Sequence, residues 1–108
     1  MLTNKVLGLL GLCARAGKIS SGMDAVCDEL KRNKVKLIIV AKDASEKTIQ
    51  NVKYLADKKS IEIIAFGTID ENSKAIGKEN RAIIGIKDKN ISDGIKKIIY
   101  GGEAFGKN

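Results

Sequence analysis

The fold is decided by the segment KLIIVA at residues 36–41, a run of aliphatic residues that is bounded by charge. Its continuity and β-branched content predict a strand that is buried on both faces. Two similar segments follow, Ile61–Phe66, which only Glu62 interrupts, and Arg81–Ile86. A shorter strand is expected at Lys18–Ser20. The sequence therefore contains the strands of a sheet of about four.

Helical patterns separate these strands. We expect helices over residues 3–16, 22–32, 45–59, 68–77 and 92–100. Thr68 and Glu71 have the spacing of a capping box, and Ser21 with Asp24 is expected to cap the second helix. Tyr54 is expected among the inner residues of the third. Strands that are apolar on both faces need helices on both faces, so the pattern predicts an α/β fold, a three-layer α/β/α sandwich with a roughly four-stranded mixed sheet.

The length of 108 residues predicts a single domain. We place this domain at residues 1–100, because no linker or repeat divides the chain, and we expect residues 101–108 to form a flexible tail. No apolar run approaches the ~20 residues that span a bilayer, and no cleavage pattern for a signal peptide follows the first helix. These features predict a cytoplasmic protein without a membrane partner.

The composition excludes much catalytic chemistry. The chain has no histidine, and so it lacks the usual base of nucleophilic hydrolases and the commonest metal ligand. Its two cysteines, Cys13 and Cys27, cannot complete a four-ligand zinc site, and we expect both to be reduced and buried. We therefore predict no catalytic residue, metal or cofactor. A small enzyme that uses the Cys27 thiol stays as a third alternative.

Three acidic residues have two interpretations each. Asp24 and Asp28 are four residues apart and share a helix face, as a catalytic pair of carboxylates could. Negative charge in the first turns of a helix is also stabilising without any function. Asp43 follows a buried strand at the edge where α/β sheets often bind ligands. Its side chain could equally start the turn into the next helix.

The charge balance favours polyanions as partners. Twenty Lys and Arg residues against thirteen Asp and Glu give a net charge of +7, an excess that attracts phosphate backbones. Many lysines can also serve solubility alone. Two basic stretches are candidates, Lys31–Lys36 and Lys78–Arg81. The first has a structural explanation as well, since a cation near a helix C-terminus is favourable by ~0.3–1 kcal/mol.

Several motifs resemble a known family. They are GLCARAGK at 11–18, Ser21-Gly22, KRNKVKLIIVAKDA at 31–44 and AIGKENRA at 75–82. As a set they resemble the kink-turn-binding ribosomal-protein superfamily of archaeal and eukaryotic large subunits, and the first two resemble its bacterial, YlxQ-like branch. The resemblance covers about residues 3 to 100. It implies an α/β/α sandwich that binds a sharply bent RNA containing tandem sheared G·A pairs.

The resemblance also implies where this RNA would lie. In the family, the start of the second helix reads guanine edges in a widened groove, and the loop before the last strand covers the kink. Gly22 matches the glycine that opens this helix. Strong binders then carry Asn-Glu and, three residues on, a lysine, where this chain has Asp24, Ala25 and Asp28. Aspartate cannot donate to guanine and alanine has no polar side-chain atom, so we expect weakened or altered specificity.

We therefore predict a non-catalytic RNA-binding protein whose partner is a structured RNA, with ribosomal RNA among the candidates. The alternative is a protein-interaction or assembly module that kept the fold and lost RNA binding. The predicted RNA-binding residues are Lys18, Gly22, Asp24, Lys31, Lys34, Lys36, Lys42, Lys78 and Arg81. We expect their positive charge to gather at a single exposed end of the sheet. The sequence indicates no particular oligomeric state.

Overall fold

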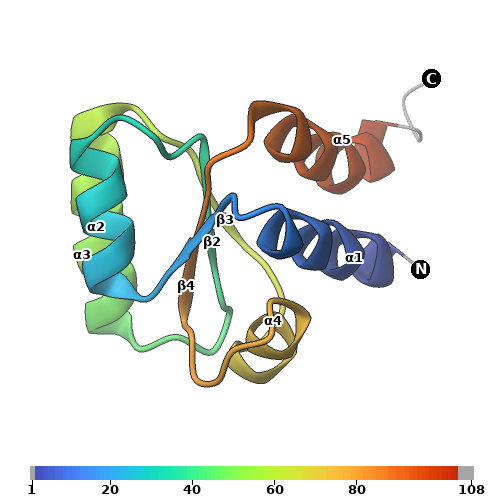
Figure 1. Cartoon of the computed structure of the whole chain (residues 1–108), viewed down its shortest axis with the longest axis horizontal. Helices are drawn as coiled ribbons and strands as arrows, with labels where there is room; N and C mark the ends of the chain where they lie inside the picture. Colours follow the sequence, from blue (N-terminus) through green and yellow to red (C-terminus); the bar gives the residue numbers. More distant parts are fainter. Residues whose placement is uncertain (1, 105–108) are drawn as a thin grey trace.

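The computed structural model describes residues 2–104 (Figure 1). Its helices are α1 (Leu2–Arg15), α2 (Met23–Lys31), α3 (Glu46–Lys59), α4 (Ile69–Ala75) and α5 (Lys89–Ala104). Its strands are β1 (Ile19–Ser21), β2 (Leu37–Val40), β3 (Ile63–Ala65) and β4 (Ile83–Ile86). The four strands form one mixed sheet, as the apolar segments predicted.

The order and direction of the strands decide which strand ends lie at the same edge of the sheet. The sheet has the order β1-β4-β2-β3, in which β4 is antiparallel to both β1 and β2, and β2 is parallel to β3. Strands β1, β2 and β3 therefore end where β4 begins. We call this the α2-start edge and define it by Gly22, Lys42 and Arg81. The opposite α2-end edge is defined by Lys18 and Lys36, together with Lys87 at the end of β4.

The two faces of the sheet bury alternate residues. Leu37 and Ile39 pack with α1 and α5, whereas Ile38 and Val40 pack with α2 and α3. All four residues of β2 are buried because the strand is covered on both sides. Helices α2 and α3 lie on one side of the sheet, and α1, α4 and α5 lie on the other (Figure 1). The predicted three-layer sandwich is confirmed.

The start of α2 differs from the prediction. Ser21 is the last residue of β1, and Gly22 is the N-cap without any side-chain cap, so the predicted capping by Ser21 and Asp24 is wrong. The Ser21 hydroxyl instead accepts a hydrogen bond from Arg81 Nε at 3.2 Å. A contact across 60 positions of sequence therefore replaces a local one. The capping box of Thr68 and Glu71 is present, as predicted.

Helix α5 is longer than the sequence predicted. It begins at Lys89 because the Asp88 carboxylate accepts a hydrogen bond from Ile91 N at 2.8 Å. It continues through Gly101 to Ala104, where a flexible tail was expected. The rest of that expected tail, residues 105–108, lies outside the described residues. Within residues 2–104 no helix has the length and apolar character needed to cross a membrane.

Candidate nucleic-acid interface

The α2-start edge joins the beginning of α2 to the segment 76–82 that leads into β4. Gly22 N donates to Ile83 O at 2.9 Å, and Ala41 N donates to Ala82 O at 2.9 Å. Gly22 adopts φ 88° and ψ 158°, a conformation that is essentially confined to glycine. This residue turns the chain from the end of β1 into α2 beside Arg81. Two segments that are distant in sequence thus lie at the same edge of the sheet, in the lower half of Figure 1.

The segment 76–82 is held by the buried Ser73, through both its hydroxyl and its backbone carbonyl. Arg81 N donates to Ser73 Oγ at 2.7 Å, and Lys78 N donates to Ser73 O at 2.8 Å. Gly77 and Asn80 have positive φ values, which allow the two tight turns of this segment. The Arg81 guanidinium donates to Glu79 O at 2.9 Å as well as to Ser21. The half-buried Arg81 is therefore oriented in advance, whereas Lys78 is exposed.

Lys42 and Asp43 follow β2 at the same edge. The Lys42 side chain is exposed, while its backbone N–H donates to Gly67 O at 2.9 Å. The Asp43 carboxylate accepts from Ile69 N at 2.8 Å and so stabilises the start of α4. The sequence left open whether Asp43 is a ligand-binding residue or a residue that starts a helix. The structure gives it the second role, but at α4 and not at the next helix, α3, whose N-cap is Ser45. Lys42 is the residue that remains available to a ligand.

Acidic side chains interrupt the positive surface along α2. Asp24 and Asp28 are exposed on this helix, and neither carboxylate has a hydrogen bond or an ion pair within residues 2–104. Ala25 is exposed between them. Negative charge in the first turn stabilises the helix start, which accounts for Asp24. These carboxylates separate the cations of the α2-start edge from those at the end of α2.

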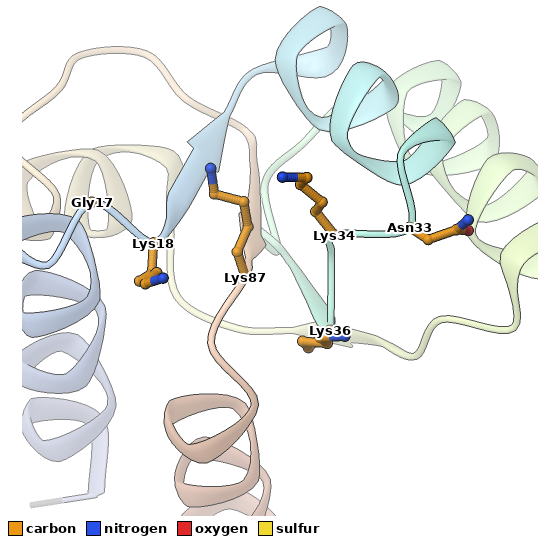
Figure 2. Close-up of a pocket in the computed structure, with 6 residues that line it drawn as sticks. All are labelled: Gly17, Lys18, Asn33, Lys34, Lys36 and Lys87. Atoms are coloured by element: carbon orange, nitrogen blue, oxygen red, sulfur yellow. The ribbon is translucent and has the colours of Figure 1, made fainter.

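The other predicted cations lie at the α2-end edge. Lys18, Lys34 and Lys36 line a cleft of about 290 Å³ together with Gly17, Asn33 and Lys87 (Figure 2). Lys31 is in the last turn of α2, on the same side. The expectation that all cations gather at one end of the sheet is wrong, because α2 runs from one edge to the other. Gly22, Asp24, Lys42, Lys78 and Arg81 are grouped around its start.

Lys87 is a member of this cleft that sequence reasoning missed. It directly follows the buried segment 81–86, as Lys42 follows the segment 36–41. An antiparallel pairing of these two strands places Lys87 beside Lys36, and Lys36 N indeed donates to Ile86 O at 2.7 Å. A lysine at the end of a buried strand was the available sequence signal for this residue. The sequence did not reveal that β4 pairs with β2 in the antiparallel direction, which brings Lys87 to Lys36.

The two cysteines have no activated thiol. Cys13 is buried as predicted, but Cys27 is only half-buried. Burial raises the pKa of the Cys27 thiol; the nearby Lys31 lowers this pKa, and Asp24 and Asp28 raise it further. Burial likewise raises the pKa of Cys13. A catalytic thiolate needs a lowered pKa, so neither thiol has the required environment. Among residues 2–104 no group of acidic and cysteine side chains has the arrangement of a metal site.

We expect slow alkylation of Cys27 by iodoacetamide at neutral pH, because its raised pKa keeps the thiol protonated. The rate should increase as the pH rises toward that pKa. Asp28→Asn removes a carboxylate that disfavours the thiolate, so it should lower the pKa and accelerate alkylation at mildly alkaline pH. Peptide mapping by mass spectrometry measures this rate for Cys27 alone. Alkylation at neutral pH that is faster than in the urea-unfolded chain would instead support an enzyme.

Comparison with known proteins identifies the family. Residues 4–96 match a model of the ribosomal protein L7Ae/L30e/S12e/Gadd45 family. The chain belongs to this family. The match covers both edges of the sheet and all nine predicted site residues, which lie between residues 18 and 81. The resemblance inferred from the sequence motifs is thereby confirmed.

Two relatives carry the name RNA-binding protein YlxQ. The Enterococcus faecium protein is 32% identical over 97 residues, which cover 90% of this chain and 93% of that protein. The Bacillus subtilis (strain 168) protein is 31% identical over 88 residues, which cover 79% and 85%. The chain therefore resembles the bacterial branch of the L7Ae family along nearly its whole length.

Solved structures show the same L7Ae-type fold. A Bacillus halodurans protein of unknown function has a TM-score of 0.83 and 32% identity, covering 88% of this chain and 96% of its own. The Giardia lamblia 15.5kD RNA binding protein has a TM-score of 0.75, covering 95% and 88%. Its identity is 19%, so this second comparison bears on the fold alone.

Proposed function

We propose that this protein binds structured RNA through the α2-start edge, with a preference for kinked RNA, and that it is not an enzyme. The observation that carries the proposal is the direct contact of the α2 start with β4 and the segment 76–82 before it: Gly22 N donates to Ile83 O, and Arg81 Nε donates to Ser21 Oγ. Membership of the L7Ae family and the two relatives named RNA-binding protein support it. Lys42, Lys78 and Arg81 supply positive charge around this junction.

The uncapped start of α2 suits a phosphate. The first N–H groups of a helix have no partner within the helix, and the helix dipole makes this end positive. The N-cap Gly22 offers no side chain to satisfy these groups. A phosphate at this position would accept hydrogen bonds from them. The helix start thus provides donors, and the surrounding cations provide long-range attraction.

The side chains of α2 favour weak or altered base recognition. Asp24, Ala25 and Asp28 occupy the positions at which the family resemblance implies contacts to guanine and phosphate. Each specific base contact is worth about 1–3 kcal/mol, and carboxylates repel a phosphate backbone. The remaining cations hold phosphates, which position RNA without reading its sequence. We therefore propose binding that depends on RNA shape and salt more than on sequence.

A titration against two RNAs tests this function. One RNA contains a kink-turn with tandem G·A pairs, and the other replaces these pairs by Watson–Crick pairs. We expect tighter binding to the kinked RNA, and an affinity that falls steeply between about 50 and 200 mM salt because counterions are released. Filter binding measures both quantities. Equal affinity for the two RNAs, or an affinity that salt does not change, would contradict the proposal.

Replacing Arg81 by glutamine should weaken RNA binding about 3- to 10-fold and lower the slope of log affinity against log salt by about 0.7–0.9. The variant removes one cation from the junction with Gly22 and leaves Lys42 and Lys78. Since Arg81 also contacts Ser21, the melting temperature is measured in parallel. The control Lys5→Gln removes an exposed cation of α1. Equal losses in both variants would refute a local role of Arg81.

The protein-interaction module is the second candidate function. The observation that favours it is the exposure of Asp24 and Asp28 without ionic partners in the described chain. Such an acidic helix face suits a basic protein surface. In that case Asp28→Lys leaves the affinity for RNA unchanged, whereas RNA binding at α2 predicts a tighter complex.

We propose ribosomal RNA as a candidate partner and the cytoplasm as the location. Both proposals follow from the ribosomal proteins in the family description and from the two free thiols, Cys13 and Cys27. Co-sedimentation with ribosomal subunits separates ribosomal RNA from other structured RNAs. A protein found only in the unbound fractions would contradict the ribosomal partner.

A further inference from the structure

The cleft at the α2-end edge collects four lysines from three parts of the chain. Lys18 precedes β1, Lys34 and Lys36 connect α2 to β2, and Lys87 follows β4. Figure 2 shows the side chain of Lys34 extended toward that of Lys87, with Lys18 and Lys36 on either side of this pair. The lining residue Asn33 points away and accepts a hydrogen bond from Lys59 Nζ at 3.2 Å. Lysines therefore make up four of the six residues that line this cleft.

Among residues 2–104, a single carboxylate forms an ion pair with a lysine of the cleft. Glu29 Oε1 lies 3.9 Å from Lys87 Nζ, at the limit of an ion pair, and Glu29 Oε2 is buried without a hydrogen bond. Within residues 2–104, Lys18, Lys34 and Lys36 form no ion pair. Three of the four positive charges thus lack a partner. Like charges in a cleft repel one another, and an anion that binds there relieves this repulsion.

The favourable interaction of cations with helix C-termini explains only part of this group of four lysines. Lys18 and Lys34 follow the C-termini of α1 and α2, where a cation is favourable. This dipole effect is confined to the last turn of a helix. Lys36 and Lys87 instead flank strands, and the sheet fixes their positions: Lys36 N donates to Ile86 O at 2.7 Å, and Lys87 N donates to Lys18 O at 2.8 Å.

We infer that this cleft is a second RNA contact, which binds the backbone phosphates of duplex extending beyond the RNA held at the α2-start edge. The inference rests on the proposed function and adds a separate site to it. The lining consists of lysines, a glycine and an asparagine, without an aromatic ring on which a base could stack. Lysine contacts to phosphate carry no sequence information, so this contact depends on the length of the duplex.

The distance between the two edges suits one RNA molecule. Lys36 and Lys42 are six positions apart, and extended chain of this length spans about 20 Å. This distance corresponds to several nucleotide steps along one strand of an A-form RNA duplex. Asp24 and Asp28 lie between the edges on α2 and repel phosphates. The geometry therefore favours two separate phosphate contacts, one at each edge, over one continuous basic surface along the RNA.

The test compares a short kink-turn RNA with one whose flanking duplex is extended by about ten base pairs, beyond the span that both edges require. The variant is Lys34→Gln with Lys36→Gln, and the control is Lys5→Gln with Lys97→Gln, two exposed cations of α1 and α5. We expect the cleft variant to bind the long RNA at least about 5-fold more weakly and to lower its salt slope by about 1.4–1.8. Binding of the short RNA should not change.

The outcomes separate this inference from the proposed function. If the wild type binds both RNAs equally well, and the cleft variant equals the control on the long RNA, the second contact is refuted while RNA binding at the α2-start edge stands. If the wild type binds neither RNA, both are refuted. Equal melting temperatures of the two double variants show that folding does not cause the difference.

Discussion

A triple variant with Asp24→Asn, Ala25→Glu and Asp28→Lys should bind kink-turn RNA about 100-fold more tightly than the wild type. Restoring two base contacts at about 1.4 kcal/mol each, within the range of such contacts, gives this factor. The lysine also replaces a charge that repels phosphate. All three positions are exposed, so the changes should leave the fold intact. Filter binding against the kinked and the Watson–Crick RNA measures the gain and its specificity.

A matched control separates base recognition from net charge. Asn4→Lys with Gly8→Lys adds the same two positive charges on α1, and Gly8 has no atom within 4 Å of an added Cβ. This control should raise the affinity for both RNAs only slightly, through long-range attraction. If the triple variant binds kinked RNA no better than the control, α2 does not enter the RNA groove. The protein-interaction function would then be favoured.

Replacing Gly22 by alanine should destabilise the protein by about 1–3 kcal/mol, the cost of a non-glycine residue in this backbone conformation. The cause is the backbone, with φ 88° and ψ 158°, and not a collision, because the nearest atom to an added Cβ is Arg81 Cδ at 4.0 Å. Relief of this strain would move the start of α2 away from Arg81. RNA affinity should therefore fall as well. Urea unfolding and filter binding measure the two effects.

The matched control for Gly22 is Gly8→Ala in α1. Gly8 is helical and exposed, so alanine should stabilise the protein by up to about 1 kcal/mol. The two glycine-to-alanine variants should thus change stability in opposite directions. A Gly22→Ala protein with wild-type stability and wild-type affinity would show that this backbone conformation does not set the helix start.

Local patterns predicted most of the architecture. The uninterrupted aliphatic run of β2 indicated a strand covered on both faces, and all four of its residues are buried. Thr68 and Glu71 marked the start of α4 because a capping box needs only four consecutive residues. Tyr54 was wrongly expected to face inward: it is 62% exposed, with Lys58 Nζ 4.5 Å from its ring centroid. An aromatic residue in α3 is therefore stabilised at the surface.

The features that sequence reasoning missed depend on long-range pairing. Ser21 could cap α2 locally, but the folded chain brings Arg81 to its hydroxyl. The basic stretch at 31–36 was expected beside that at 78–81, yet α2 crosses the sheet between Gly22 and Lys36 and separates them. Lys87 lines the cleft because β4 is antiparallel to β2, which places the end of β4 beside the start of β2. Strand order and direction decide these positions, and neither has a local signal.

Amide mapping by NMR with the short kink-turn RNA tests the central claim most directly. The junction of the α2 start with the segment 76–82 predicts the largest shifts at residues 21–26, 41–43 and 77–82, which belong to the α2-start edge. The chemical shifts of the amides of α1 and α5, which lie on the other side of the sheet from α2, should not change. Shifts confined to α1 and α5, or no shift at saturating RNA, would contradict RNA binding at this edge.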